Sequence, residues 1–252
     1  MAAAEGSDVA PAAGRSQLAR VLRSLVGWWV ALLVTTLATG ALIVHADNAF
    51  VLRHLNAPVD ADLQPARHGL HAVAAVVTRL GGQPVAGILL VVLAVAFYRL
   101  RTDLALALMI IYAGADLVTT IAKLVIQRPG PRERFAAGLK DYSFPSGHST
   151  TAAALLVGAA LLLATSGAPR FPARRTVTAS AVALLLAVCV AISRLVLGVH
   201  FLTDVCAGFL VGTGWAAIVV RSWPPAGMPT PLDRLPTRRD HGKAGQKSQA
   251  NP

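Results

Sequence analysis

Six long apolar stretches, nearly free of charged residues, are the feature that most restricts how this chain can fold. They cover residues 24–44, 80–98, 104–122, 149–169, 176–193 and 200–220. Each is close to the length of about 20 residues that an α-helix needs to cross a bilayer core. Ala, Val and Leu dominate them and aromatic residues are few, which favours helices over strands. The sequence therefore predicts an all-α fold, a polytopic membrane helix bundle with six transmembrane helices.

The charged residues support a membrane protein and argue against a nucleic-acid partner. They make up only 14% of the chain, whereas about 25% is usual in a soluble domain. The formal net charge is +11, which alone would suit nucleic-acid binding. The basic residues are instead placed around the apolar stretches, as expected for a protein whose partners are the bilayer and a membrane-bound ligand.

The two cysteines give no sign of a disulfide or a metal centre. Cys189 and Cys206 lie inside apolar stretches, without a CxxC motif or a Cys/His cluster nearby. We therefore expect them to be small buried residues.

Three segments flank or interrupt the predicted bundle, which spans 24–221. We expect 1–23 to be a flexible cytoplasmic N-terminus and 222–252, rich in Pro and basic residues, a disordered cytoplasmic tail. Residues 46–79 form a predicted outer interfacial segment, whose part 63–79 suits an amphipathic helix on the membrane surface. The first apolar stretch exceeds the about 7–15 residues of a signal-peptide core, so it is expected to be an uncleaved anchor.

The basic residues also predict the orientation of the chain in the cell membrane. Six spans place both termini on one side, and Lys and Arg mark the cytoplasmic side. Of the 23 Lys and Arg residues, 14 fall on the side of the termini and 9 on the other. The 14 are Arg15, Arg20, Arg23, Arg99, Arg101, Arg170, Arg174, Arg175, Arg221, Arg234, Arg238, Arg239, Lys243 and Lys247. We expect cytoplasmic termini and a site on the outer face.

Ionisable residues gather in three groups on that outer side. The groups are "KLVIQRPGPRER" after the third span, "PSGH" before the fourth, and "SRLVLGVHFLTD" between the fifth and sixth. Ionisable groups at membrane level are costly and are usually functional. We therefore expect the three groups to form one site.

Residues from all three groups suit a phosphate. Ser146 and Gly147 fall at a predicted helix N-terminus, whose backbone amides and dipole attract anions. Glycine lets an oxyanion approach the backbone because it has no Cβ. Lys123 and Arg194 add cations suited to phosphate oxygens.

The third group supplies a nucleophile. His200 and Asp204 are four residues apart, one turn along the same face of a helix. The carboxylate can hold one imidazole nitrogen and leave the other to attack phosphorus. His148 would protonate the leaving oxygen and then activate the water that releases phosphate. No cluster with metal-ligand spacing occurs, so neither a metal nor another cofactor is expected.

At these residues the chain resembles the type 2 phosphatidic acid phosphatase (PAP2) superfamily of integral-membrane lipid phosphatases. The three motifs of that family are K-x6-R-P, P-S-G-H and S-R-x5-H-x3-D. The second matches in full at Pro145–His148, and the third at Ser193, Arg194, His200 and Asp204. The resemblance covers about residues 80–220, and it implies that spans three to six carry the site of a metal-independent phosphatase.

The first motif departs from the family pattern. Seven residues after Lys123 the family has an arginine, but this chain has Gly130. Arg128 and Arg132 lie two residues before and after it. We expect Arg128 to take over the phosphate contact, because it stays closest to the end of the third span.

The resemblance implies a lipid phosphate or diphosphate as substrate. A polyprenyl diphosphate, such as the undecaprenyl carrier of cell-wall synthesis, is the first choice, and phosphatidic acid or phosphatidylglycerol phosphate the next. The soluble haloperoxidase chemistry found in the same superfamily fits a six-span chain less well. The glycine at 130 leaves open a different class, a catalytically silent relative that binds or moves a lipid phosphate.

Overall fold

The computed structural model describes residues 9–46, 64–131, 142–165 and 172–223, and the regular elements in these ranges are all helical. Six helical segments are long and apolar enough to cross a membrane. This confirms the predicted all-α bundle with six spans. In chain order the elements are α1 (Val9–Ala46), α3 (Gln64–Val77), the 3₁₀ turn η1 (Thr78–Gly81), α4 (Gln83–Leu100), α5 (Thr102–Ile126), α6 (Gly147–Ala152), the π turn η2 (Ala153–Val157), α7 (Gly158–Thr165), α8 (Ala173–Val196) and α9 (Leu202–Ser222).

Helix α1 begins well before the first apolar stretch. Residues 9–23, expected to be flexible, continue the membrane helix toward the N-terminus. The sequence "QLARVLRSL" consists mostly of good helix formers. Pro11 falls in the first turn of the helix. The backbone N–H that proline lacks would have no acceptor within the helix at that position. The apolar pattern marked the membrane-spanning part of this helix but not its beginning.

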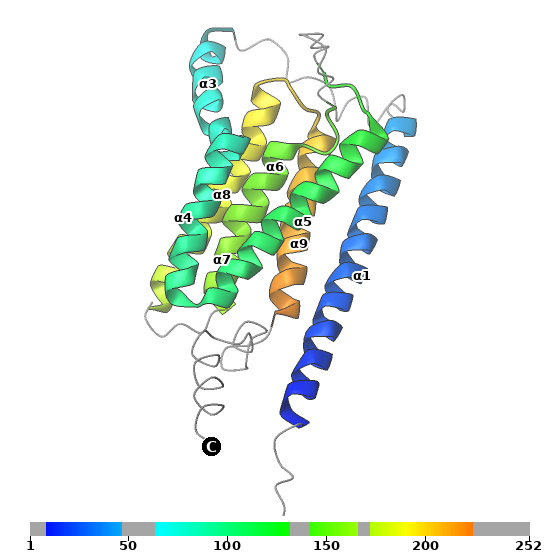
Figure 1. The fold of residues 1–252 in the computed structure, drawn as a ribbon. Helices are drawn as coiled ribbons and strands as arrows, with labels where there is room; N and C mark the ends of the chain where they lie inside the picture. Colours follow the sequence, from blue (N-terminus) through cyan, green and yellow to red (C-terminus); the bar gives the residue numbers. More distant parts are fainter. Residues whose placement is uncertain (1–8, 47–63, 132–141, 166–171, 224–252) are drawn as a thin grey trace, which may run out of the picture.

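The segment after α1 is helical where it is described. Residues 64–77 form α3, as expected for the 63–79 region, whereas 47–63 lie outside the described residues. Large apolar side chains of α3 are exposed, among them Leu70, Val73 and Val76. Helix α3 leads through η1 into α4 (Figure 1). Its placement on a membrane surface stays a prediction, as does the disordered tail, which lies outside the described residues.

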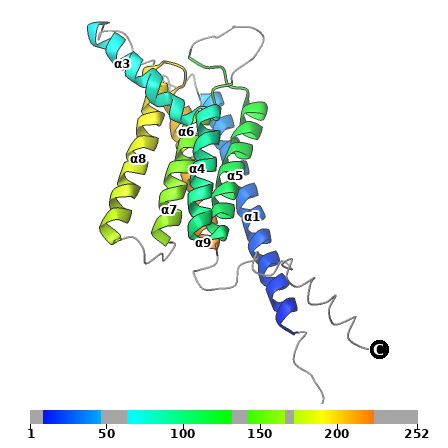
Figure 2. The same ribbon diagram turned by 60° about the vertical axis from the view of Figure 1, so that its left-hand side comes forward.

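Three of the helical segments next to the polar groups form the inner part of the bundle. Helix α5, the α6–η2–α7 segment and α9 have larger buried shares than α1, α4 and α8. Helix α9 packs against α5 and α6, while α4 and α1 cover α5 (Figures 1 and 2). The start of α1 and the end of α9 lie at one end of the bundle. The end of α5 and the starts of α6 and α9 lie at the other.

One glycine allows α9 to pack directly on the backbone that begins α6. A Cβ atom added to Gly208 would collide with the carbonyl oxygen of Ser146. Small residues at helix contacts let backbones approach closely in membrane proteins. The close approach lets the Ser146 amide donate a 2.9 Å hydrogen bond to the carbonyl oxygen of Asp204. Two of the predicted polar groups are thereby joined through the main chain.

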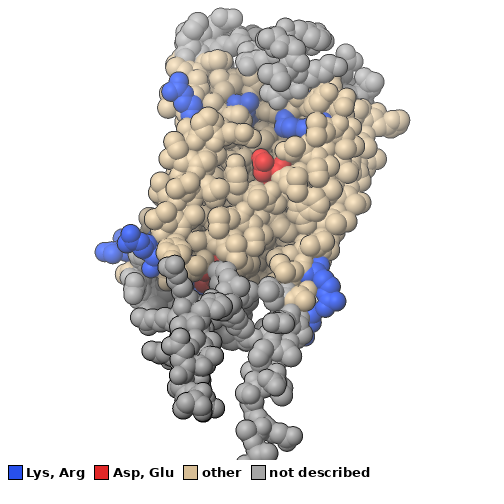
Figure 3. Space-filling view, in the orientation of Figure 1, with Lys and Arg blue, Asp and Glu red and all other residues tan. Residues whose placement is uncertain are grey.

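The surface of the bundle fits a bilayer. Figure 3 shows Lys and Arg side chains near the two ends of the bundle, with other residues forming nearly all of the visible flank between them. Both cysteines are free thiols. Cys206 is exposed and Cys189 half-buried, which corrects the expectation that both are buried.

Candidate active site

The three predicted polar groups meet at one end of the bundle. Lys123 lies in the last turn of α5, and its Cε atom would lie 3.9 Å from a Cβ atom added to Gly147. The Lys123 ammonium also donates to the carbonyl oxygen of Tyr142, in the segment that leads to α6. Arg194 lies in the last turn of α8, and both cations act electrostatically on His200. Residues of the three sequence motifs thus lie around His200 and the start of α6.

His200 precedes α9 instead of lying within it. The helix begins at Leu202, and Asp204 is in its first turn. The Asp204 Oδ2 atom accepts a 2.9 Å hydrogen bond from the Phe201 amide. The same oxygen lies 3.7 Å from His200 Nδ1, which is longer than a hydrogen bond. Asp204 therefore does lie beside His200, as expected, but the two residues do not share a helical face, because His200 lies in the turn that precedes the helix.

The surroundings of His200 keep its imidazole neutral. The side chain lies between α8 and α9, outside the membrane-spanning segments, and is only 6% exposed. Burial lowers the pKa of His200, and the positive charges of Arg194 and Lys123 lower it further. Asp204 opposes them by stabilising the imidazolium, but the net shift is downward. Near neutral pH the imidazole therefore keeps the lone pair that a nucleophile requires.

Asp204 links the three polar groups. Its side chain is fully buried, at 0% exposure. Oδ1 accepts a hydrogen bond from Arg128 Nη1 in an ion pair, Oδ2 accepts from the Phe201 amide, and the carbonyl oxygen accepts from the Ser146 amide. A buried carboxylate is costly unless it is paired and hydrogen-bonded, and these contacts meet that requirement.

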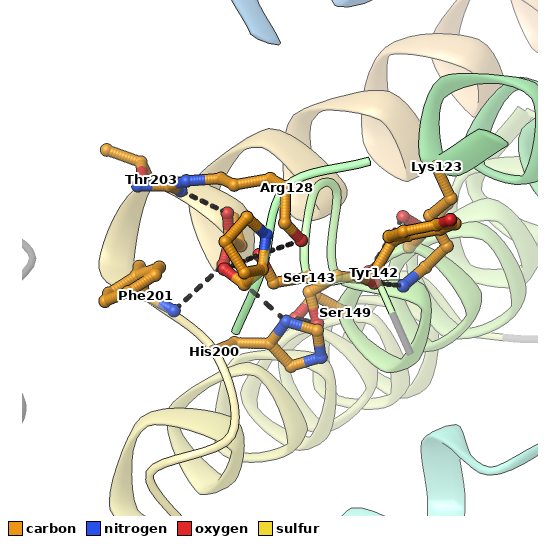
Figure 4. A network of polar contacts seen from close by, with 12 residues as sticks. Lys123, Arg128, Tyr142, Ser143, Ser149, His200, Phe201 and Thr203 are labelled. Carbon is orange, nitrogen blue, oxygen red and sulfur yellow. Dashed lines mark hydrogen bonds and ion pairs between the residues drawn. The ribbon is translucent and has the colours of Figure 1, made fainter. Parts of the chain in front are cut away.

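Arg128 lies on the turn that carries Asp204. Its side chain is 1% exposed, and Nη1 donates a 2.9 Å hydrogen bond to Thr203 Oγ1 in addition to the Asp204 contact. Its Cζ atom lies 4.5 Å from the centre of the Phe201 ring, within range of a cation–π interaction. Figure 4 shows the guanidinium group directed at this turn, away from Lys123. The contacts differ from those expected of a phosphate ligand.

The direction of Arg128 follows from how α5 ends. Gln127 closes the helix in the left-handed conformation, with φ of 50°, a common way for a helix to stop. The chain then turns, and Arg128 is fixed when Ser143 donates a 2.8 Å backbone hydrogen bond to its carbonyl oxygen. Its side chain thereby reaches α9. Arg132, the other arginine near Gly130, lies outside the described residues.

The start of α6 offers fewer amides to an anion than expected. The Ser146 amide is bonded to the Asp204 carbonyl oxygen, and Ser146 Oγ accepts a 3.1 Å hydrogen bond from Ser149 Oγ. Ser146 is thus engaged within the protein. The amide of Gly147 is in the first turn of α6, where N–H groups have no acceptor within the helix. Of the two predicted amides, that of Gly147 is suited to an anion.

Sequence reasoning missed the part of the site that η1 forms. Thr78 Oγ1 accepts a 2.8 Å hydrogen bond from Arg194 Nη1. A Cβ atom added to Gly81 would lie 2.7 Å from the carbonyl oxygen of His148, and one added to Gly82 would lie 3.6 Å from His148 Nε2. The adjacent glycines before Pro84 were the available signal. These two glycines were expected at the start of the second span and Thr78 in the interfacial segment, without a role in the site.

Among the described residues, no three His, Cys, Asp or Glu side chains form a group that could hold a metal ion. The site is instead built from two histidines, one carboxylate and three cations: His148, His200, Asp204, Lys123, Arg128 and Arg194. This set can carry out nucleophilic and acid–base chemistry on an anionic group.

Comparison with known proteins identifies the family. A sequence model of the PAP2 superfamily matches residues 104–227, a range that includes the three motifs. The chain belongs to the PAP2 superfamily. The resemblance seen in its motifs is thereby confirmed, and so is the fold it implied.

A curated sequence and a solved structure, both from Bacillus subtilis, are similar to this chain. Phosphatidylglycerophosphatase B of strain 168 is 35% identical over 116 residues, which are 46% of this chain and 56% of that protein. This chain therefore spans just over half the length of that relative. The crystal structure of a transmembrane PAP2 type phosphatidylglycerolphosphate phosphatase matches with a TM-score of 0.61 and 29% identity. That match covers 76% of this chain and 93% of the other.

Proposed function

We propose that this PAP2 protein is a membrane phosphatase that hydrolyses the phosphate monoester of a glycerophospholipid, with phosphatidylglycerol phosphate as the first choice. The observation that carries this is His200, a buried imidazole with a lowered pKa, beside the cations Lys123 and Arg194. A neutral nucleophile among cations suits attack on an anionic phosphorus.

The choice of lipid revises the expectation from sequence. Sequence reasoning put a polyprenyl diphosphate first and phosphatidylglycerol phosphate among the alternatives. The curated relative is named phosphatidylglycerophosphatase B, and the solved structure is described as a phosphatidylglycerolphosphate phosphatase. The comparisons therefore favour the alternative, and polyprenyl diphosphate becomes the second candidate.

The first chemical step transfers the phosphoryl group to His200. Because Nδ1 faces Asp204, we assign the attack to Nε2. An N–P bond forms as the bond from phosphorus to the lipid alcohol oxygen breaks, and protonated His148 donates a proton to that oxygen. Lys123, Arg194 and the Gly147 amide would stabilise the charge on the phosphoryl oxygens.

The second step releases phosphate and restores the enzyme. His148, now neutral, takes a proton from a water molecule whose oxygen attacks phosphorus. The N–P bond breaks, and its electron pair returns to His200 Nε2. The products are the lipid alcohol and inorganic phosphate. No step requires a metal ion.

A substrate panel tests this proposal. Purified protein in detergent should release phosphate from phosphatidylglycerol phosphate with kcat/KM at least about tenfold above that for phosphatidic acid or undecaprenyl diphosphate, a difference of about 1.4 kcal/mol. EDTA should leave the rate within about twofold, because the proposed chemistry uses side chains alone. Strict Mg²⁺ dependence would contradict the mechanism. Binding of these lipids without release of phosphate would identify a silent lipid-phosphate binder instead.

The orientation in the membrane is a further prediction. Basic residues on the side of the termini outnumber those on the other side, 14 of 23 against 9 of 23. This bias predicts cytoplasmic termini and an active site on the outer face. In a variant with Cys189 and Cys206 replaced by serine, a new cysteine within 133–140 should react with a membrane-impermeant thiol reagent in intact cells. A matched cysteine at exposed Ala173 should react only after the cells are opened. The reverse pattern would place the site in the cytoplasm.

A further inference from the structure

We propose that Arg128 is a positioning residue that acts on His200 through Asp204, and that it is not a ligand of the substrate phosphate. This inference rests on the proposed phosphatase function and goes beyond it. It also changes which side chains neutralise the phosphate. Among the residues that the structure describes, Lys123 and Arg194 would then supply the positive charge.

The first argument is that Arg128 contacts three residues of a single turn. Its guanidinium group lies over the ring of Phe201 and donates to Thr203 Oγ1 and Asp204 Oδ1. This turn begins directly after His200, so a side chain that fixes the turn also fixes the nucleophile. Figure 4 shows the imidazole of His200 and the side chain of Arg128 on either side of it.

The second argument is the way the Asp204 carboxylate divides its contacts. Oδ1 is held by Arg128, and Oδ2 is held by the Phe201 amide while it lies 3.7 Å from His200 Nδ1. The carboxylate is therefore near enough to orient the imidazole, but it is fixed short of a full hydrogen bond. Arg128 thus limits how strongly Asp204 stabilises the protonated imidazole.

The third argument is burial. The side chains of Arg128 and Asp204 are 1% and 0% exposed. The ion pair is therefore little screened by solvent, and removal of one partner leaves an uncompensated buried charge. Without Arg128, the carboxylate is expected to move closer to His200 Nδ1, which lies 3.7 Å from Oδ2. The pKa of His200 would then rise, because a closer anion favours the imidazolium.

A phosphate ligand and a positioning residue therefore give opposite results. Loss of a phosphate ligand weakens binding of phosphate and its analogues and leaves the pH profile in place. Loss of a positioning residue moves the acid limb of kcat/KM to higher pH, because the free enzyme then becomes protonated at His200 more easily. Binding of vanadate, an analogue of the transferring phosphoryl group, would change little.

The experiment compares Arg128→Met, Asp204→Asn and the double variant with the wild-type protein in detergent. Arg128→Met should lower kcat by about a hundredfold, shift the acid limb of kcat/KM upward, and change the Ki of vanadate by less than about threefold. The double variant should be no slower than Asp204→Asn alone, because the two residues act as one unit. Arg132→Met, in the same loop, is the matched control and should leave all three quantities near the wild-type values.

Two further measurements keep the proposal open to refutation. If Arg128→Met does not fold, the double variant still tests it, because that variant leaves no unpaired buried charge. Vanadate Ki in the double variant about a hundredfold above that of Asp204→Asn would show that Arg128 binds phosphate, and would overturn the proposal. NMR titration of ¹³C-labelled His200 reports its pKa without any turnover. An upward shift in Arg128→Met supports the coupling even if the protein proves not to be a phosphatase, whereas an unchanged pKa refutes it.

Discussion

Replacement of His200 by alanine is expected to lower the turnover of phosphatidylglycerol phosphate by at least about 10⁴-fold, the scale seen when a catalytic nucleophile is removed. The imidazole is the group that would form the covalent bond to phosphorus. The structure gives it a buried position beside Lys123 and Arg194, and its pKa is lowered so that the neutral form prevails. Release of inorganic phosphate by purified protein in detergent measures the effect.

The control for this prediction is a histidine away from the site. His71 lies in α3 and is half-buried, and His71→Ala should keep turnover within about twofold of wild type, as is usual for changes outside functional features. Both variants should elute as the same folded species in detergent. Turnover near the wild-type rate in the His200 variant would contradict the covalent mechanism.

Replacement of His148 by alanine is expected to separate the two chemical steps. With a lipid substrate, turnover should fall by about 10²–10⁴-fold, because the leaving alcohol loses its proton donor. With an activated aryl phosphate, the leaving group departs without a proton, so the first step should still occur. Attack by water should then be slow, and an acid-labile phosphohistidine should accumulate at His200. A burst of aryl alcohol measures the first step. Phosphoryl label that stays on the protein measures the accumulated phosphohistidine.

The double variant His148→Ala with His200→Ala supplies the control, because it should show neither burst nor label. Label that persists in the double variant would place the phosphoryl group on another residue. Equal loss of both steps in His148→Ala, without any burst, would mean that His148 organises the site instead of transferring protons.

The helical bundle was predictable because its determinants are local. A stretch of about 20 apolar residues must form a helix to cross a bilayer, whatever its neighbours are. The beginning of α1 was missed because the prediction relied on the local apolar pattern alone. Residues 9–23 carry charges and therefore end the apolar pattern, yet their helix propensity continues the helix to Val9.

The members of the site were also largely present in the sequence. Lys123, His148, Arg194 and His200 were named from their spacing and residue type, and the structure brings them together at one end of the bundle. Spacing sufficed because each group directly follows or precedes a membrane span, and the spans of a bundle must return to the same membrane surface.

Contacts between distant parts of the chain were decided only by the tertiary structure. The partner of Arg128 is 76 residues away, at Asp204, and the Thr78 partner of Arg194 is 116 residues away. The His200–Asp204 geometry also depended on where α9 begins, since the two side chains share a helix face only if the helix includes His200. Sequence thus determined which side chains reach the site. Which of them face the phosphate and which hold one another was determined by packing, because buried charges take the partners that long-range contacts bring within reach.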